Sequence, residues 1–137
     1  MSEQTVTTGE VVATFLEACG VQTAFGVISI HNLPMLDAIG RRGNIRFVPS
    51  RGEAGALNMA DAYARTRGEL GVAFTSTGTG AGNAAGALVE AETAGTPLLH
   101  LTGQIDLPPL VRGRGYIHET KAQLGMLRSI SKAVYRV

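Results

Sequence analysis

The chain has 137 residues, a formal net charge of +1 and a single cysteine, Cys19. This length suits one domain, here 1–137, and 45% hydrophobic against 17% charged residues is typical of a chain with a packed core. The near-neutral charge and the lack of tryptophan argue against nucleic-acid binding, no apolar run has membrane-spanning length, and a lone cysteine favours a reducing, cytoplasmic setting.

Helices and strands are predicted to alternate along the whole chain. A helix is expected over 7–20, where Thr7 and Glu10 fit a capping box and the apolar stripe follows at Val11, Val12, Phe15 and Leu16. Further helices are expected over 31–43, 51–65, 78–95 and 119–131, and strands over 21–28, 44–49, 70–76, 97–104 and 132–137. This order predicts right-handed βαβ units and therefore an α/β fold of three layers, a parallel sheet with helices on both faces.

Parallel sheets bind ligands beyond the carboxyl ends of their strands, which directs attention to the loops that follow the predicted strands. Here these loops are 26–32, 49–53, 76–83 and 102–120. Candidate functional residues are expected in these segments.

A carboxylate lies on the inward face of the helix predicted over 51–65. At about 100° per residue, Glu53 shares one narrow sector with Ala56, Leu57, Ala60 and Ala64. The opposite, solvent-facing stripe is polar and contains Asn58, Asp61 and Arg65. Two interpretations stay open: Glu53 caps the helix or pairs with Arg51, or it is a functional carboxylate at a strand-end loop.

A glycine-rich segment, TSTGTGAGNAAGAL, follows a predicted strand and opens a helix. Gly80, Gly82 and Ala85 match the G-x-G-x-x-A pattern of dinucleotide-binding turns, although the turn follows the third strand and no acidic residue ends the next strand, where Asp106 comes late. A nucleotide-binding α/β module is therefore one alternative. The other is that glycine serves a tight turn and close helix–sheet packing.

Three motifs, in this order, resemble the pyrimidine-binding domain of thiamine diphosphate enzymes. They are RGEAGALNMADAYAR, TSTGTGAGN and PLLHLTGQ, and the similarity to the acetolactate synthase, benzoylformate decarboxylase and pyruvate decarboxylase group extends over almost the whole chain. The resemblance implies an enzyme that decarboxylates or ligates 2-oxo acids with thiamine diphosphate. A non-catalytic interaction domain of the same fold is a further alternative.

The resemblance also implies roles for individual residues. In that family a glutamate hydrogen-bonds N1′ of the cofactor's aminopyrimidine and so activates its C2 carbon, and the matching residue here is Glu53. His118 lies where relatives place an acid–base or carboxylate-binding residue. Cofactor contacts are implied for Glu53, Ile28, Ser29, Gly78, Thr79 and Asn83, and substrate contacts for His31, Ser76 and Gln104. His100, in mid-strand, is expected to be structural.

The sequence departs from each named enzyme at the substrate-facing positions. Ser76 stands where benzoylformate decarboxylases have a histidine, and residues 116–119 read Tyr-Ile-His-Glu where acetolactate synthases have Ala-Phe-Gln-Glu. The substrate, and the choice between decarboxylation and carboligation, therefore stay open.

The chain contains no Gly-Asp-Gly sequence, the motif with which the family binds Mg²⁺ and the diphosphate. The resemblance places that motif on a separate diphosphate-binding domain of another subunit, so we expect a homodimer or tetramer and no metal ligands in this chain. The chain is expected to be the N-terminal part of a larger enzyme or one of two subunits. Alone it should form half of the site and expose an apolar face around Glu53 and residues 76–83.

Overall fold

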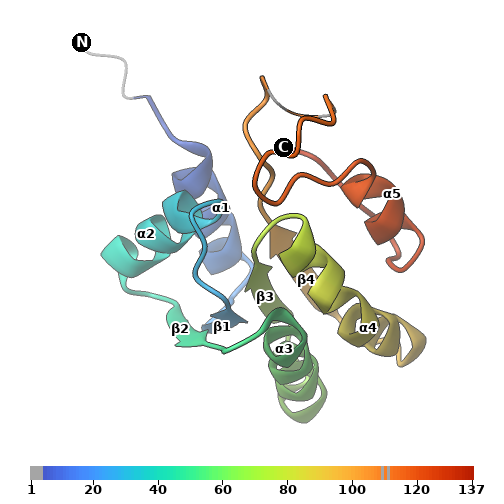
Figure 1. Ribbon diagram of the computed structural model, residues 1–137. Coiled ribbons are helices and arrows are strands. Elements are labelled where there is room, and N and C mark those ends of the chain that lie inside the picture. Colours follow the sequence, from blue (N-terminus) through green and yellow to red (C-terminus); the bar gives the residue numbers. More distant parts are fainter. Residues whose placement is uncertain (1–4, 109, 111) are drawn as a thin grey trace.

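The computed structural model describes residues 5–108, 110 and 112–137. Strands β1 (Thr23–Gly26), β2 (Arg46–Pro49), β3 (Gly71–Thr75) and β4 (Leu98–Thr102) form a parallel sheet in the order β2-β1-β3-β4. Helices α1 (Thr8–Ala18) and α2 (Leu33–Arg42) lie on one face, and α3 (Glu53–Arg67), α4 (Thr79–Thr93) and α5 (Gln123–Arg128) lie on the other (Figure 1). The predicted three-layer α/β fold is confirmed.

The central strand β3 contributes side chains to two hydrophobic cores, one on each face of the sheet. Val72 and Phe74 pack with α1 and α2, whereas Ala73 between them packs with α3, α4 and α5. All five residues of β3 are buried, which explains why its sequence is continuously apolar instead of alternating. Within the part of the chain that the structure describes, no helix is long and apolar enough to cross a membrane.

Helix α1 buries only part of the predicted apolar stripe: Leu16 and Val12 belong to the core, and Val11 and Phe15 do not. Val11 and Phe15 are 57% and 58% exposed, whereas Ala13 and Leu16 are fully buried. The reason is the close approach of α1 and α2, since a Cβ atom at Gly9 would overlap the backbone of α2. The face of α1 with Gly9 and Ala13 therefore turns towards the core and α2, and Val11 and Phe15 turn outwards.

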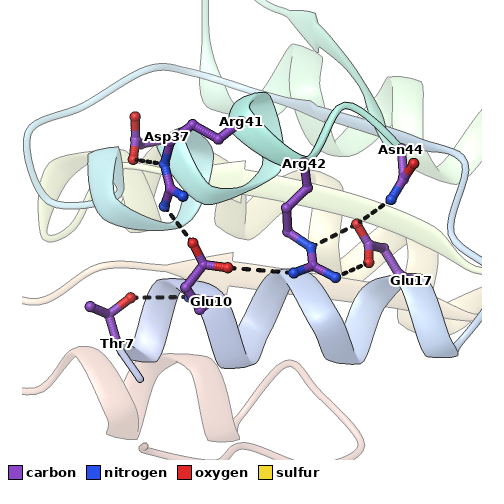
Figure 2. A network of polar contacts seen from close by, with 7 residues as sticks. All are labelled: Thr7, Glu10, Glu17, Asp37, Arg41, Arg42 and Asn44. Atoms are coloured by element: carbon purple, nitrogen blue, oxygen red, sulfur yellow. Dashed lines mark hydrogen bonds and ion pairs between the residues drawn. The ribbon is translucent and has the colours of Figure 1, made fainter. Parts of the chain in front are cut away.

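Charged side chains join α1 to α2 at their outer surface (Figure 2). Arg41 contacts Glu10, and Arg42 contacts both Glu17 and Glu10. Thr7 caps α1 as predicted, because its Oγ1 accepts the backbone N–H of Glu10 at 3.2 Å. The Glu10 carboxylate of the expected capping box is instead paired with the two arginines.

The carboxyl-terminal segment differs most from the sequence prediction. The helix expected over 119–131 is shorter, at Gln123–Arg128, and the strand predicted over 132–137 is wrong. Val134 packs against the core beneath α5, while Tyr135 is 86% exposed. A strand must pair its backbone groups with a neighbour, and within the described residues this segment joins no sheet.

Candidate functional site

The loops after β1 and β3 meet at the carboxyl edge of the sheet. Strand β2 lies on one side of β1 and strand β3 on the other, so the strand order reverses between β1 and β3. The chain leaves these two neighbouring strands in opposite directions. Such a reversal is the usual ligand-binding place of an open parallel sheet. Here the hydroxyls of Ser29 and Ser76 lie 2.8 Å apart, which joins the predicted loops 26–32 and 76–83.

Glu53 is the first residue of α3 and faces the first turn of α4. It is partly buried, and Ala56, Leu57, Ala60 and Ala64 are buried behind it, which confirms the predicted inward face. A Cβ atom at Gly80 would lie 2.7 Å from Oε1 of Glu53 and 2.7 Å from Cβ of Ser76. Asn83 Nδ2 donates to Oε2 of Glu53 over 3.4 Å.

The two alternatives for Glu53 are distinguished by these contacts. The N-cap of α3 is Gly52, and no side-chain cap bond is formed there. Among the described residues Glu53 belongs to no ion pair, so Arg51 does not neutralise it. The carboxylate therefore faces the glycine turn without a cationic partner.

His31 and His118 converge on the same site from the loops after β1 and β4. Their ring centroids are 5.6 Å apart in an edge-to-face arrangement. Nδ1 of His118 lies 3.0 Å from Oγ1 of Thr79, and Nδ1 of His31 lies 3.4 Å from Oγ of Ser29. Partial burial lowers the pKa of His31, the neighbouring His118 lowers it further, and Asp106 acts in the opposite direction.

The loop that carries His118 is closed by hydrogen bonds from its backbone to the side chain of Glu119. The Glu119 carboxylate accepts the N–H groups of Gly113, at 2.8 Å, and Tyr116, at 3.1 Å, and the Gly113 bond contributes most to lowering the pKa of Glu119. His118 has a left-handed backbone with φ of 62°, and a Cβ atom at Gly78 would overlap its carbonyl group. The loop is therefore pressed directly onto the glycine turn.

Two buried amide side chains escaped the sequence analysis. Asn32 accepts the N–H of Ser29 at 2.9 Å and donates to the carbonyls of Val27 and Thr75, at 2.9 and 3.2 Å. Asn32 is the N-cap residue of α2, but its side chain makes no cap bond to that helix. It instead joins the loop after β1 to the end of β3. Gln123, at the start of α5, carries no sequence signal beyond its place in a predicted helix.

Two other predicted residues, Gln104 and Ile28, make contacts in the turn after β3 and beside α2. Gln104 accepts the N–H of Ile105 at 2.9 Å and contacts Thr77 at 3.3 Å, inside the turn. Ile28 is 60% exposed and lines a groove between α2 and β2 with Leu36 and Phe47.

The apolar face expected around Glu53 and residues 76–83 is not formed by these two segments themselves. The exposed positions there are small or polar, among them Ala54, Thr79 and Asn83. Large exposed apolar side chains occur instead in the loops after β1 and β4, at Ile28, Ile30, Leu107 and Ile117.

A carboxylate thus faces a glycine turn at the point where the strand order of the parallel sheet reverses. This arrangement is typical of a ligand-binding α/β domain. The chain belongs to the family described as thiamine pyrophosphate enzyme, N-terminal TPP binding domain, whose model matches residues 6–126. The resemblance seen in the sequence is thereby confirmed.

The chain is similar to several members of that family. It is 37% identical over 129 residues to a probable 2-ketoarginine decarboxylase of Pseudomonas aeruginosa, covering 94% of this chain. It is 32% identical to the acetolactate synthase large subunit of Lactococcus lactis, covering 98% of this chain. A thiamine diphosphate-dependent 4-hydroxybenzoylformate decarboxylase of Rhodococcus jostii matches 93% of it with a TM-score of 0.83 and 28% identity. The chain spans 23% of the length of each of these proteins.

Proposed function

We propose that this chain is the pyrimidine-binding domain of an enzyme that decarboxylates or ligates 2-oxo acids with thiamine diphosphate. The observation that carries the proposal is the placement of Glu53 against Gly80, without a cationic partner among the described residues. The absent side chain of Gly80 and the small residues around it suit the approach of a flat ring. When bound, thiamine diphosphate supplies the carbanion chemistry that protein side chains lack.

Glu53 acts as the group that holds a proton at N1′ of the aminopyrimidine. Its partial burial strengthens such a hydrogen bond because little water competes for it. Asn83 orients the carboxylate by donating to Oε2. Ile28, Ser29, Gly78 and Thr79 are assigned as further cofactor contacts.

His118 acts on the substrate as an acid–base or carboxylate-binding group. Thr79 engages its Nδ1, which leaves Nε2 for the substrate. The lowered pKa of His31 favours a neutral ring beside His118. Ser76 and Gln104 complete the proposed substrate-facing set.

The nucleotide-binding alternative is disfavoured by the same contact. The Glu53 carboxylate lies against Gly80 and would repel a phosphate bound at that turn. The backbone N–H groups of Gly80 and Gly82 also donate to carbonyls within the turn, at 3.0 and 2.9 Å. Retention of Glu53 likewise disfavours a domain that has lost its chemistry.

The test replaces Glu53 by glutamine in the complete enzyme and measures hydrogen–deuterium exchange at C2 of bound thiamine diphosphate. A neutral amide cannot hold the N1′ proton in the same way, so C2 exchange should become much slower while the fold persists. Glu92→Gln, an exposed position near the end of α4, is the matched control. Unchanged exchange in Glu53→Gln would refute the assignment.

A second part of the proposal concerns the division of the site. We assign residues 1–137 to one domain of a larger, oligomeric enzyme, and Mg²⁺ with the diphosphate to a separate domain of another subunit. The chain's 23% share of its relatives' length supports this division. Isothermal titration of the 137-residue chain should show weak thiamine diphosphate binding that Mg²⁺ does not change. Tight, Mg²⁺-dependent binding would contradict the division.

A further inference from the structure

A single buried side chain joins the ends of two strands beneath the site. Gln123 is 5% exposed, and its Oε1 accepts the backbone N–H of Gly78 at 2.7 Å and the hydroxyl of Thr77 at 2.8 Å. Its Nε2 donates to the carbonyl of Gly103 at 3.0 Å. One amide group thus connects the turn after β3, the end of β4 and the start of α5.

The turn that Gln123 contacts has an unusual backbone. Gly78 has φ of 56° and ψ of −107°, a conformation that L-residues with a side chain rarely adopt. Its N–H group is buried, and without Gln123 this donor would lose its partner. The next residue, Thr79, begins α4, so the conformation of Gly78 sets the position of the first turn of that helix.

The turn is held from two sides. The backbone of His118 presses on Gly78, and the amide of Gln123 receives its N–H. Two residues of the site lie immediately beyond: Thr79, whose hydroxyl contacts His118, and Gly80, which faces Glu53. A shift of Gly78 therefore moves both contacts together.

We propose that Gln123 is a positioning residue, which fixes the turn at Gly78 and thereby places Thr79 and Gly80 for cofactor binding. Its effect on the cofactor rests on the proposed function, whereas its effect on the turn does not. The role needs one acceptor and one donor in the same planar group, which glutamine provides.

Two substitutions separate this role from simple packing. Gln123→Met keeps the length of the side chain and removes all three hydrogen bonds. Gln123→Glu keeps the acceptor oxygen, but its ionised carboxylate has no donor for the Gly103 carbonyl and repels it. When the carboxyl group is protonated, its O–H can donate to that carbonyl again. The defect of Gln123→Glu should therefore lessen as the pH falls. Gln22→Met, at an exposed position before β1, is the matched control.

The first measurement is deuterium exchange of the peptide containing Gly78, Thr79 and Gly80, in the full-length protein without ligand. Loss of a buried hydrogen bond should accelerate exchange about tenfold in Gln123→Met and leave Gln22→Met unchanged. Exchange as slow as in the wild type would overturn the clamp. If Gln123→Met does not fold, the exchange rate of Gln123→Glu relative to the wild type, measured at pH 5.5 and at pH 8, decides the same point, because the ratio removes the intrinsic pH dependence of amide exchange; a ratio near one at both pH values would overturn the clamp.

The second measurement is the thiamine diphosphate affinity of the complete enzyme in the presence of Mg²⁺. The affinity of each variant is compared with that of the wild type at the same pH. We expect a loss of about tenfold in Gln123→Met at every pH, and a loss in Gln123→Glu that diminishes on acidification. Faster exchange with unchanged affinity would overturn the positioning role. Absence of binding by the wild type would instead refute the proposed function, while the exchange result still decides whether Gln123 holds the turn.

Discussion

The two helical layers of this protein differ in the polar contacts between their helices. Helices α1 and α2 are joined at their outer surface by ion pairs, chiefly Arg41 with Glu10 and Arg42 with Glu17 (Figure 2). Helices α3 and α4 present small residues to their core, at Ala56, Ala60, Ala64, Gly80, Ala81, Ala84 and Ala91. A polar contact between them runs from Asn83 to Glu53.

This difference explains where the site lies. Small side chains let α3 and α4 approach closely, so that Glu53 meets the bare backbone of Gly80. On the same side of the sheet, burial lowers the pKa of His100, which shares its face of the sheet with Leu98, to about 4. Exposed ion pairs, by contrast, contribute little to stability and can be varied without effect on a site.

The largest expected effect is the response of the α3–α4 layer to acid. His100 is neutral in the folded protein and accepts or donates one hydrogen bond with Thr75 at 2.8 Å. Because its folded pKa of about 4 lies below the unfolded value of 6.5, stability is complete above pH 6.5 and falls as the pH drops towards 4. The loss should approach about 3 kcal/mol.

Denaturant unfolding across this pH range tests the prediction. His100→Gln, which stays uncharged, should lose much less stability than the wild type between pH 6.5 and 4. Parallel curves for the two proteins would mean that His100 is readily protonated in the folded protein.

The second-largest effect is expected when a methyl group is added at Gly80, where α3 and α4 are in contact. Gly80→Ala places Cβ 2.7 Å from both Oε1 of Glu53 and Cβ of Ser76, so the carboxylate must move, and C2 exchange of bound thiamine diphosphate should fall about 100-fold. Gly82→Ala is the matched control, because open space surrounds that position. It should stabilise α4 by about 0.5–1 kcal/mol. Equal behaviour of the two variants would contradict the close contact.

A smaller effect is expected for the histidine that approaches this layer from the loop after β4. His118→Asn is chosen because asparagine tolerates the left-handed backbone found there. Loss of one substrate contact should lower turnover of a 2-oxo acid about tenfold and leave C2 exchange near normal. A fall in both quantities, or in neither, would make His118 a structural residue.

The smallest effect is expected on the other side of the sheet. Arg42→Ala removes exposed contacts to Glu17 and Glu10, so the thermal midpoint should decrease slightly at low salt. At 1 M salt, where screening acts within about 3 Å, the difference should vanish. Cofactor affinity should not change. A reduced affinity would show that the α1–α2 layer influences the site.

Local sequence patterns determined the order of the elements and the inward face of α3. Those predictions depend on periodicity, capping and turn residues within a few positions of one another, such as Thr7 before α1. The same local logic found Glu53 and the glycine turn as separate features. It also erred locally, since it assigned Phe15 to the core and a strand to 132–137.

Only the tertiary structure decided which of these features meet. The strand order β2-β1-β3-β4 joins Ser29 to Ser76, and the fold brings His118 to His31 and Gln123 to Gly78. These pairs are separated by at least 45 residues in the chain, and nothing local to either member encodes its partner. Whether an apolar stripe is buried, or a segment finds a strand to pair with, likewise depends on the surface that the rest of the chain presents to it.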